Sequence, residues 1–412
     1  MKAMLEQPLT SEAIADPRTY ANDAALHALL SRLRSEGPIH RVEAEGYLPF
    51  WLLVRHADIV EMEKKADKFI SAPVQSIIQL KDEARATIAA TGGSSQMRNV
   101  AAMDGPEHKI YRNITQSYFT PKGLTEVVRG IEELSVEFVD RIIATGGHCN
   151  FAEFAMSFPL RVIMQMLGVP PQDEALMLRL SQQTLTSEDS GLGSGGDPAA
   201  ILMEVFAYFS KIVEERRADP TSDLASVIAN AKVDGKYLSA QDIFGYFFVV
   251  ATAGHDTTSY AMTGGLLALL NNPSELEKLR ADPSLLPNAV EEILRWVTPV
   301  KQFCRTATED CELLGKQIKK GDVVSLMYPS ANRDEDVFED AFSFRVDRKP
   351  NRHLAFGTGP HVCLGQYLAR FELITFFREF LARVSEIALS GETRYVESTF
   401  VGGPKHLPIS FR

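Results

Sequence analysis

The pattern of hydrophobic and polar residues along the chain predicts many helices and a few short strands. In the region that follows Cys363, apolar residues recur at the spacing of one helix face. Helices are also expected over residues 23–35 and through most of residues 106–170. Short apolar runs typical of strands occur at residues 51–54, 323–327 and 407–411. The predicted fold class is therefore mainly α with small β-sheets.

The longest helix is expected to begin at Ser239 and to end near Asn271, before Pro273. Ser239 can cap it, and Asp242 three residues later adds a signal similar to a capping box. At 1.5 Å per residue, such a helix would be about 45–50 Å long. Because most of it is apolar on all sides, it should cross the protein interior.

The segment Ala-Gly-His-Asp-Thr-Thr at residues 253–258 lies inside this helix. An acid beside two threonines is unfavourable among apolar residues unless the polar groups find partners. Threonine hydroxyls can bond to carbonyls one turn earlier and bend the helix, and Gly254 would permit a local widening. Two interpretations remain open: a structural turn with satisfied threonines, or an unwound turn in which Asp256 and Thr257 relay protons.

Two segments rich in small residues, 71–103 and 187–198, interrupt the helical pattern. Both could belong to a gate over a pocket. They could equally be ordinary solvated loops, and the sequence does not separate these alternatives.

Composition excludes several classes of protein. The 412 residues are 45% hydrophobic and 24% charged, with a net charge of −11. No tract rich in lysine and arginine is present, so nucleic acid is not an expected partner. The N-terminus lacks a long apolar run, which argues against a signal peptide or membrane anchor and favours the cytoplasm. The four cysteines form no disulfide pattern, and no linker divides the chain, so one domain over 1–412 is expected.

The most informative segment is His-Leu-Ala-Phe-Gly-Thr-Gly-Pro-His-Val-Cys-Leu at residues 353–364. It predicts a glycine-rich loop that presents Cys363 at the start of a helix, where backbone N–H groups favour a thiolate. Thiolates bind soft metals, including haem iron. A lone cysteine is more often a buried, inert thiol. Zinc bound by His361 and Cys363 is a further alternative, although zinc sites normally need four such ligands.

The full pattern Phe356-Gly357-x-Gly359-x-His361-x-Cys363-x-Gly365 resembles the haem-binding loop of the cytochrome P450 family. The pair Glu292-x-x-Arg295, which Arg348 would join, is similar to the buried ion pairs that support this loop in the family. The resemblance implies a single-domain fold shaped like a triangular prism, with haem between the long helix and the cysteine-loop helix. Four segments resemble the bacterial α-terpineol monooxygenase group: 253–258, 329–334, 350–354 and 400–405.

The resemblance also assigns roles to residues. Cys363 would bind the iron of haem b, Thr257 would orient O2, and Asp256 would supply protons; His255 would have a structural or solvent-network role. Phe356 would pack against the cysteine side of the ring. The contacts to the two haem propionates are expected from His108, Arg112, Arg305 and His361.

The predicted function is hydroxylation of a small hydrophobic substrate, such as a monoterpene or an alkyl- or aryl-benzene. Its pocket is expected to be lined by Val249, Thr252, Ala253, Val300, Phe400 and Val401. Electrons would come from a 2Fe–2S ferredoxin and its reductase, through a basic patch formed by Lys109, Arg112, Arg345, Arg352 and Arg370.

Two other functions are considered. A haem peroxygenase would use peroxide directly, and the acid–alcohol pair at Asp256 and Thr257 argues against it. A non-enzymatic haem-based binder of small molecules would not need that pair either.

Overall fold

The fold is known from a computed structural model, which describes residues 11–81, 84–86, 88, 98–173, 175–177 and 198–412. Part of the first predicted gate segment, 71–103, therefore lies outside the described residues. The second, 187–198, lies outside them except for its last residue, which begins helix α10.

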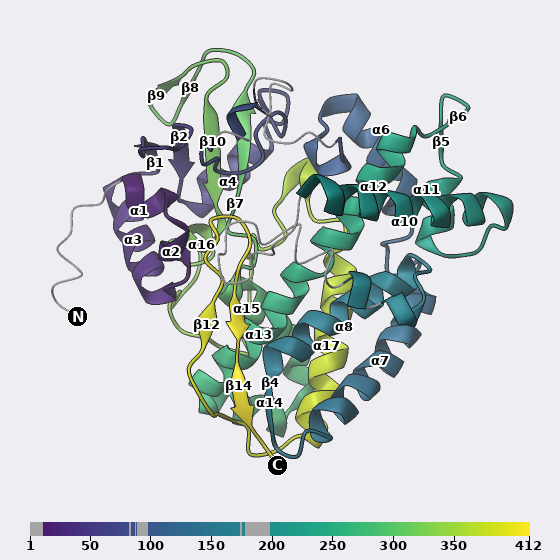
Figure 1. The fold of residues 1–412 in the computed structure, drawn as a ribbon. Helices are drawn as coiled ribbons and strands as arrows, with labels where there is room; N and C mark the ends of the chain where they lie inside the picture. Colours follow the sequence, from purple (N-terminus) through teal and green to yellow (C-terminus); the bar gives the residue numbers. More distant parts are fainter. Residues whose placement is uncertain (1–10, 82–83, 87, 89–97, 174, 178–197) are drawn as a thin grey trace.

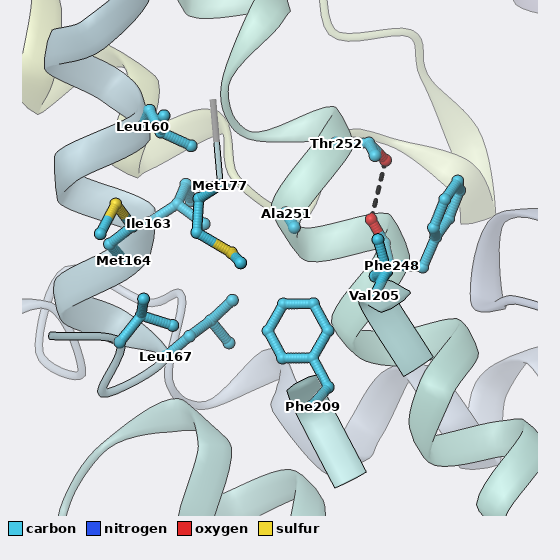
Figure 2. A pocket seen from close by; sticks show the side chains of 11 residues that line it. Leu160, Ile163, Met164, Leu167, Met177, Val205, Phe209, Phe248, Ala251 and Thr252 are labelled. Carbon is cyan, nitrogen blue, oxygen red and sulfur yellow. Dashed lines mark hydrogen bonds between the residues drawn. The ribbon is translucent and has the colours of Figure 1, made fainter. Parts of the chain in front are cut away.

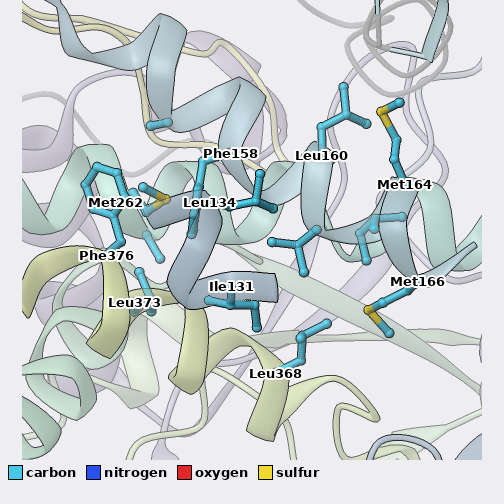
Figure 3. Packing of buried hydrophobic residues seen from close by; sticks show 14 of the residues in the cluster. Ile131, Leu134, Phe158, Leu160, Met164, Met166, Met262, Leu368, Leu373 and Phe376 are labelled. Carbon is cyan, nitrogen blue, oxygen red and sulfur yellow. The ribbon is translucent and has the colours of Figure 1, made fainter. Parts of the chain in front are cut away.

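A body of packed helices forms most of the molecule (Figure 1). Its centre is α13 (Asp256–Asn271), which is buried along almost its whole length and packs on α8, α15 and α17. Figure 3 shows Met262 of α13 among apolar side chains of α7, α8 and α17, including Leu134, Phe158 and Phe376. The neighbouring helices are α7 (Thr125–Ile143), α8 (Phe151–Met166), α12 (Ala240–Ala253), α15 (Leu286–Val297) and α17 (Gln366–Arg383).

The main sheet lies beside the N-terminal helices, on the other side of the molecule from α7 and α17 (Figure 1). Its strand order is β1-β2-β10-β7-β3. Only the β2–β10 pair is parallel, and Val323 of β10 lies opposite Thr306 of β7. Its strands are β1 (Ile39–Val42), β2 (Phe50–Leu53), β3 (Phe69–Ile70), β7 (Gln302–Ala307) and β10 (Val323–Met327).

The remaining elements complete the described part of the chain. A three-stranded sheet has the order β11-β14-β4, and three two-stranded ribbons pair β5 with β6, β8 with β9 and β12 with β13. The remaining helices are α1 (Ser11–Ala15), α2 (Pro17–Tyr20), α3 (Asp23–Glu36), α4 (His56–Glu63), α6 (Gly105–Gln116), α10 (Pro198–Ala218), α11 (Leu224–Ala229), α14 (Pro273–Ala281) and α16 (Tyr328–Ala331). The remaining strands are β4 (His148–Asn150), β5 (Lys232–Val233), β6 (Lys236–Tyr237), β8 (Cys311–Leu313), β9 (Lys316–Ile318), β11 (Ala388–Leu389), β12 (Arg394–Tyr395), β13 (Pro404–His406) and β14 (Pro408–Ser410).

The predicted fold class is confirmed, as are the helix at residues 23–35 and the strand at residues 323–327. The long helix is predicted wrongly in one respect, because it is two helices, α12 and α13, which break at Gly254 and His255. Each of these two helices is shorter than α10, which has 21 residues. The prediction that Ser239 caps the first helix is confirmed, since its side chain accepts a hydrogen bond from the backbone N–H of Asp242.

Among the helices of the described residues, none combines the length and apolar character needed to cross a lipid bilayer.

Candidate active site

A large cavity lies between the α12–α13 break and the loop that precedes α17. Its empty volume is about 1520 Å³, part of which is open to solvent. Residues that line it on the α12–α13 side are Val249, Val250, Ala253, Gly254, Thr257 and Thr258. Residues that line it on the loop side are Phe356, Gly357, His361, Val362, Cys363, Leu364 and Gly365.

The backbone of the loop holds Cys363 against the cavity. The N–H of Cys363 donates to the carbonyl oxygen of Phe356 at 2.8 Å, which closes the loop. Gly359 has a φ of +69°, and a Cβ there would lie 2.8 Å from the backbone oxygen of Glu63, so this position requires glycine. α17 begins three residues after Cys363.

The free thiol of Cys363 does not favour ionisation in this environment. Burial raises its pKa, although the backbone N–H of Gly365 and the guanidinium of Arg112 act in the opposite direction. The helix start was predicted to favour the thiolate, but burial raises the pKa of Cys363 by more than the nearby N–H groups lower it. A bound metal would reverse the balance, because a coordinating thiol loses its proton.

The pairing predicted for Glu292 is confirmed. Arg295 donates to both of its carboxylate oxygens at 2.8 Å, and Nε of Arg348 lies 3.0 Å from Oε2. Asn351 and the backbone N–H of Arg345 also donate to this carboxylate. Because Glu292 and Arg295 have no exposed surface, this network ties α15 firmly to the segment before the Cys363 loop.

Three of the residues expected at the propionates meet at one edge of the cavity. The rings of His108 and His361 stack with centroids 4.1 Å apart. Nη2 of Arg112 donates to the backbone oxygen of Val362 at 2.7 Å. Burial, together with His361 and Arg112, lowers the pKa of His108 to about 4, so without an anion beside it this ring is neutral near pH 7.

The fourth, Arg305, lines the same cavity but already has a partner. Its Nη2 donates to Oε1 of Glu63 at 2.8 Å. Glu63 also accepts from the backbone N–H of Thr358 at 2.7 Å and from the hydroxyl of Tyr328 at 3.2 Å. Burial raises the pKa of Glu63, and the charge of Arg305 opposes this shift.

Glu63 and Asp104 were not predicted. Asp104 accepts from the backbone N–H groups of Ser71 and Ala72, and its Oδ1 lies 3.6 Å from Nε2 of His361. Each of these acids has partners more than 30 residues away in the chain, so no local pattern could have identified it.

At the α12–α13 break, the side chains of Thr257 and Asp256 point to different surroundings. Thr257 lines the cavity, and its hydroxyl donates to the backbone oxygen of Ala253 at 2.9 Å. Asp256 is 3% exposed and is not among the described residues that line the cavity. Instead, its Oδ1 lies 2.8 Å from Nδ1 of His255. The acid and the alcohol are therefore neighbours in the chain, while only the alcohol faces the cavity.

A further buried acid, Glu372 on α17, was also not predicted. Neither of its carboxylate oxygens has a hydrogen bond of normal geometry with a described residue. Burial raises its pKa well above the usual range, and the Thr258 hydroxyl opposes this shift. Since Thr258 lines the cavity, Glu372 lies close behind the cavity wall.

The predicted substrate-pocket residues separate into two groups. Val249, Ala253 and Val300 line the large cavity. Phe400 and Val401 are one layer further out, where the Phe400 ring contacts that of Phe303 and Val401 pairs with Val300.

Thr252 lines a second, apolar cavity between α8, α10 and α12, with an empty volume of about 480 Å³ (Figure 2). Its hydroxyl donates to the backbone oxygen of Phe248 at 2.8 Å, so it offers no free donor to a ligand there.

The donor set of the large cavity fits haem, which the sequence resemblance implies. One side of the cavity presents a single sulfur, and its wall also presents Arg112, Arg305 and two histidines that could bind two carboxylates. Zinc fits poorly, because no group of three or more His, Cys, Asp or Glu side chains in the described part of the chain could hold a metal ion.

Comparisons with known proteins agree with this geometry. The family profile described as “Cytochrome P450” matches residues 197–393. Cytochrome P450-terp from a Pseudomonas species is 38% identical over 408 residues, which cover 96% of this chain and 95% of that protein. A steroid C26-monooxygenase from Mycolicibacterium smegmatis is 34% identical, over 93% of this chain and 90% of that protein.

The crystal structure of CYP108D1 from Novosphingobium aromaticivorans superposes with a TM-score of 0.90. The two chains are 39% identical, and the match covers 98% of each. The similarity therefore extends over the whole fold as well as the cysteine loop.

Proposed function

This chain belongs to the cytochrome P450 family of haem-containing monooxygenases, and we propose that it hydroxylates a small hydrophobic substrate such as a monoterpene or an alkyl- or aryl-benzene. Enzymes of this family bind O2 and hydrophobic substrates and require redox partners. We propose further that residues 1–412 form one haem domain. The single observation that carries the proposal is the large cavity, which brings together Cys363, Thr257 and an apolar wall.

Cys363 is the proposed iron ligand, and His108, Arg112, Arg305 and His361 are the proposed partners of the two haem carboxylates. Bound haem supplies the iron that takes up electrons and activates O2. The anionic sulfur of Cys363 would donate charge to this iron. Phe356 would shield the sulfur from water, and the guanidinium of Arg370 lies 4.5 Å from the centre of the Phe356 ring.

On the opposite side of the cavity, Thr257 is the proposed group that orients O2 and passes protons to it. Its hydroxyl can exchange the bond to Ala253 for one to a molecule in the cavity, since Thr257 is only partly buried. Asp256 is the proposed proton donor. Because its carboxyl group contacts His255 rather than the cavity, delivery requires its side chain to turn or a water molecule to bridge the gap.

The wall of the cavity supports a small, apolar substrate. Besides Val249, Ala253 and Val300, it includes Val250, Leu294 and Phe303. These side chains offer no hydrogen bond, so a polar substrate would lose its contacts with water without replacement. A steroid is the alternative suggested by one of the relatives, and it would need more of the cavity.

Titration of the purified haem protein with a panel of compounds tests the substrate class. We expect monoterpenes and alkyl- or aryl-benzenes to displace water from the iron and shift its spin state. A response only to steroids, or only to large polar compounds, would reject this assignment while leaving the family unaffected.

We also propose a 2Fe–2S ferredoxin with its reductase as the electron donor, docking near the Cys363 loop. Of the five basic residues predicted there, Lys109 and Arg352 are exposed, whereas Arg112 is bound to Val362 and Arg370 to Glu291. Changing Lys109 or Arg352 to Glu should slow reduction by an acidic ferredoxin, most strongly at low salt. Lys211→Glu, an exposed position on α10, serves as the control.

A further inference from the structure

His255 lies at the break between α12 and α13 and has no exposed surface. Its ring bridges two groups. Nε2 lies 2.8 Å from the backbone oxygen of Met156 on α8, and Nδ1 lies 2.8 Å from Oδ1 of Asp256, at an ion-pair distance but without the geometry of a normal hydrogen bond. His255 therefore contacts the same carboxyl group that is proposed to supply protons to the cavity.

The contacts of His255 determine how many protons the pair can hold. A carbonyl oxygen can only accept a hydrogen bond, so Nε2 must carry a hydrogen. In a neutral ring Nδ1 then has only a lone pair, and an ionised Asp256 would face it with lone pairs as well. The contact is favourable only if one more proton lies on the pair, either as imidazolium with carboxylate or as neutral imidazole with carboxylic acid.

A second histidine in the same molecule does not require this additional proton. Nδ1 of His353 accepts a hydrogen bond from the backbone N–H of Ala355 at 3.2 Å, and its Nε2 lies 3.0 Å from Oε2 of Glu291. A neutral ring satisfies both contacts of His353. The carbonyl of Met156 makes the difference, because it fixes the hydrogen of His255 on the nitrogen remote from Asp256.

We propose that His255 is a positioning residue that keeps one proton on the His255–Asp256 pair, ready for use in the cavity. The inference rests on the proposed role of Asp256 and Thr257. Hydroxylation consumes the substrate RH, O2, two electrons and two protons, and it yields ROH and water. The two electrons come from the redox partner. The pair would supply one of the two protons, and a proton from solvent would restore it before the next turnover.

Replacing His255 by Asn tests this inference. The amide of Asn can donate a hydrogen bond to Asp256, but it cannot hold the additional proton. With O2 and reductant, we expect the yield of product per electron pair to fall by about 10- to 100-fold, the lower range of effects from proton transfer. The electrons should appear instead as hydrogen peroxide.

A reaction driven by hydrogen peroxide provides an internal control. Peroxide and RH give ROH and water with no additional protons or electrons, so the His255→Asn variant should keep close to wild-type peroxide-driven turnover. A merely structural defect would lower both reactions. An equal loss in the two reactions would therefore overturn the inference.

Ser259→Ala is the matched control, since the buried Ser259 hydroxyl donates to the backbone oxygen of His255 at 2.9 Å but holds no proton for Asp256. We expect unchanged product per electron pair. Full coupling in His255→Asn, or equal uncoupling in Ser259→Ala, would contradict the inference. If Asp256→Asn uncouples the reaction and His255→Asn does not, only this inference fails; if Asp256→Asn stays coupled, the proposed function of Asp256 fails first.

Discussion

The buried acids on the two sides of the large cavity differ in how many hydrogen-bond partners they have. Behind the Cys363 loop, Glu292 accepts hydrogen bonds from two arginines, an asparagine and a backbone N–H. Across the cavity, Oδ1 of Asp256 lies at an ion-pair distance from His255, and neither this oxygen nor the carboxyl group of Glu372 has a hydrogen bond of normal geometry to a described residue. A fully paired acid fixes the position of a loop, whereas an acid with free hydrogen-bonding capacity can exchange a proton.

The largest effect should come from breaking the fully paired side. Glu292→Gln removes one charge from a buried network and leaves Arg295 and Arg348 uncompensated, which typically destabilises by about 3–5 kcal/mol. We expect reduced haem content and a lower midpoint in denaturant unfolding. As a control, Glu379→Gln affects a partly exposed pair with Arg383 and should change stability by less than about 1 kcal/mol. If both variants lost the same unfolding free energy, the Glu292 network would contribute no more to stability than a partly exposed ion pair.

On the α12–α13 side of the cavity, we expect a smaller effect on stability but a large effect on the coupling of electron use to product formation. Thr257→Ala should lower the yield of product per electron pair by roughly 10-fold, because a hydroxyl at the cavity is lost. Peroxide release and substrate consumption, measured together, check this. Thr263→Ala is a suitable control, since Thr263 makes the same type of bond to a backbone oxygen further along α13. Unchanged coupling in Thr257→Ala would remove Thr257 from the proposed proton path.

The smallest effect concerns Glu372, whose pKa is raised in the folded protein. Above the ordinary pKa of 4.5, the unfolded chain releases this proton while the folded protein retains it, so stability falls as the pH rises. Glu372→Gln removes the effect and should make stability less dependent on pH, by at most about 1.4 kcal/mol per pH unit. Urea unfolding of both proteins between pH 5 and pH 8, a range that lies above the ordinary pKa, gives the comparison. An equal pH dependence would mean that Glu372 is ionised in the folded state.

The sequence was sufficient for features that depend on local patterns. The strand at residues 323–327, the helix at residues 23–35 and the cap at Ser239 are readable from apolar spacing and capping residues. Glu292 and Arg295 are three residues apart, so their pairing is also local. The glycine-rich loop around Cys363 has a restrictive pattern of its own.

The features that were not predicted depend on distant parts of the chain. The partner of Arg305 is Glu63, which lies 242 residues away in the chain. Glu63 also accepts a hydrogen bond from the backbone N–H of Thr358, which is 295 residues away from it. The direction of the Asp256 side chain depends on His255 and, through it, on Met156 in another helix. Thr252 lines a different cavity because it lies on a different face of α12 from Val249 and Ala253, which line the large cavity.

The carbon monoxide spectrum of the reduced protein tests the central claim, that Cys363 binds haem iron as a thiolate, most directly. The account predicts the red-shifted band of a thiolate-ligated haem for the wild-type protein and its loss in Cys363→Ser. A band typical of imidazole ligation in the wild type, or an unchanged red-shifted band in Cys363→Ser, would contradict it.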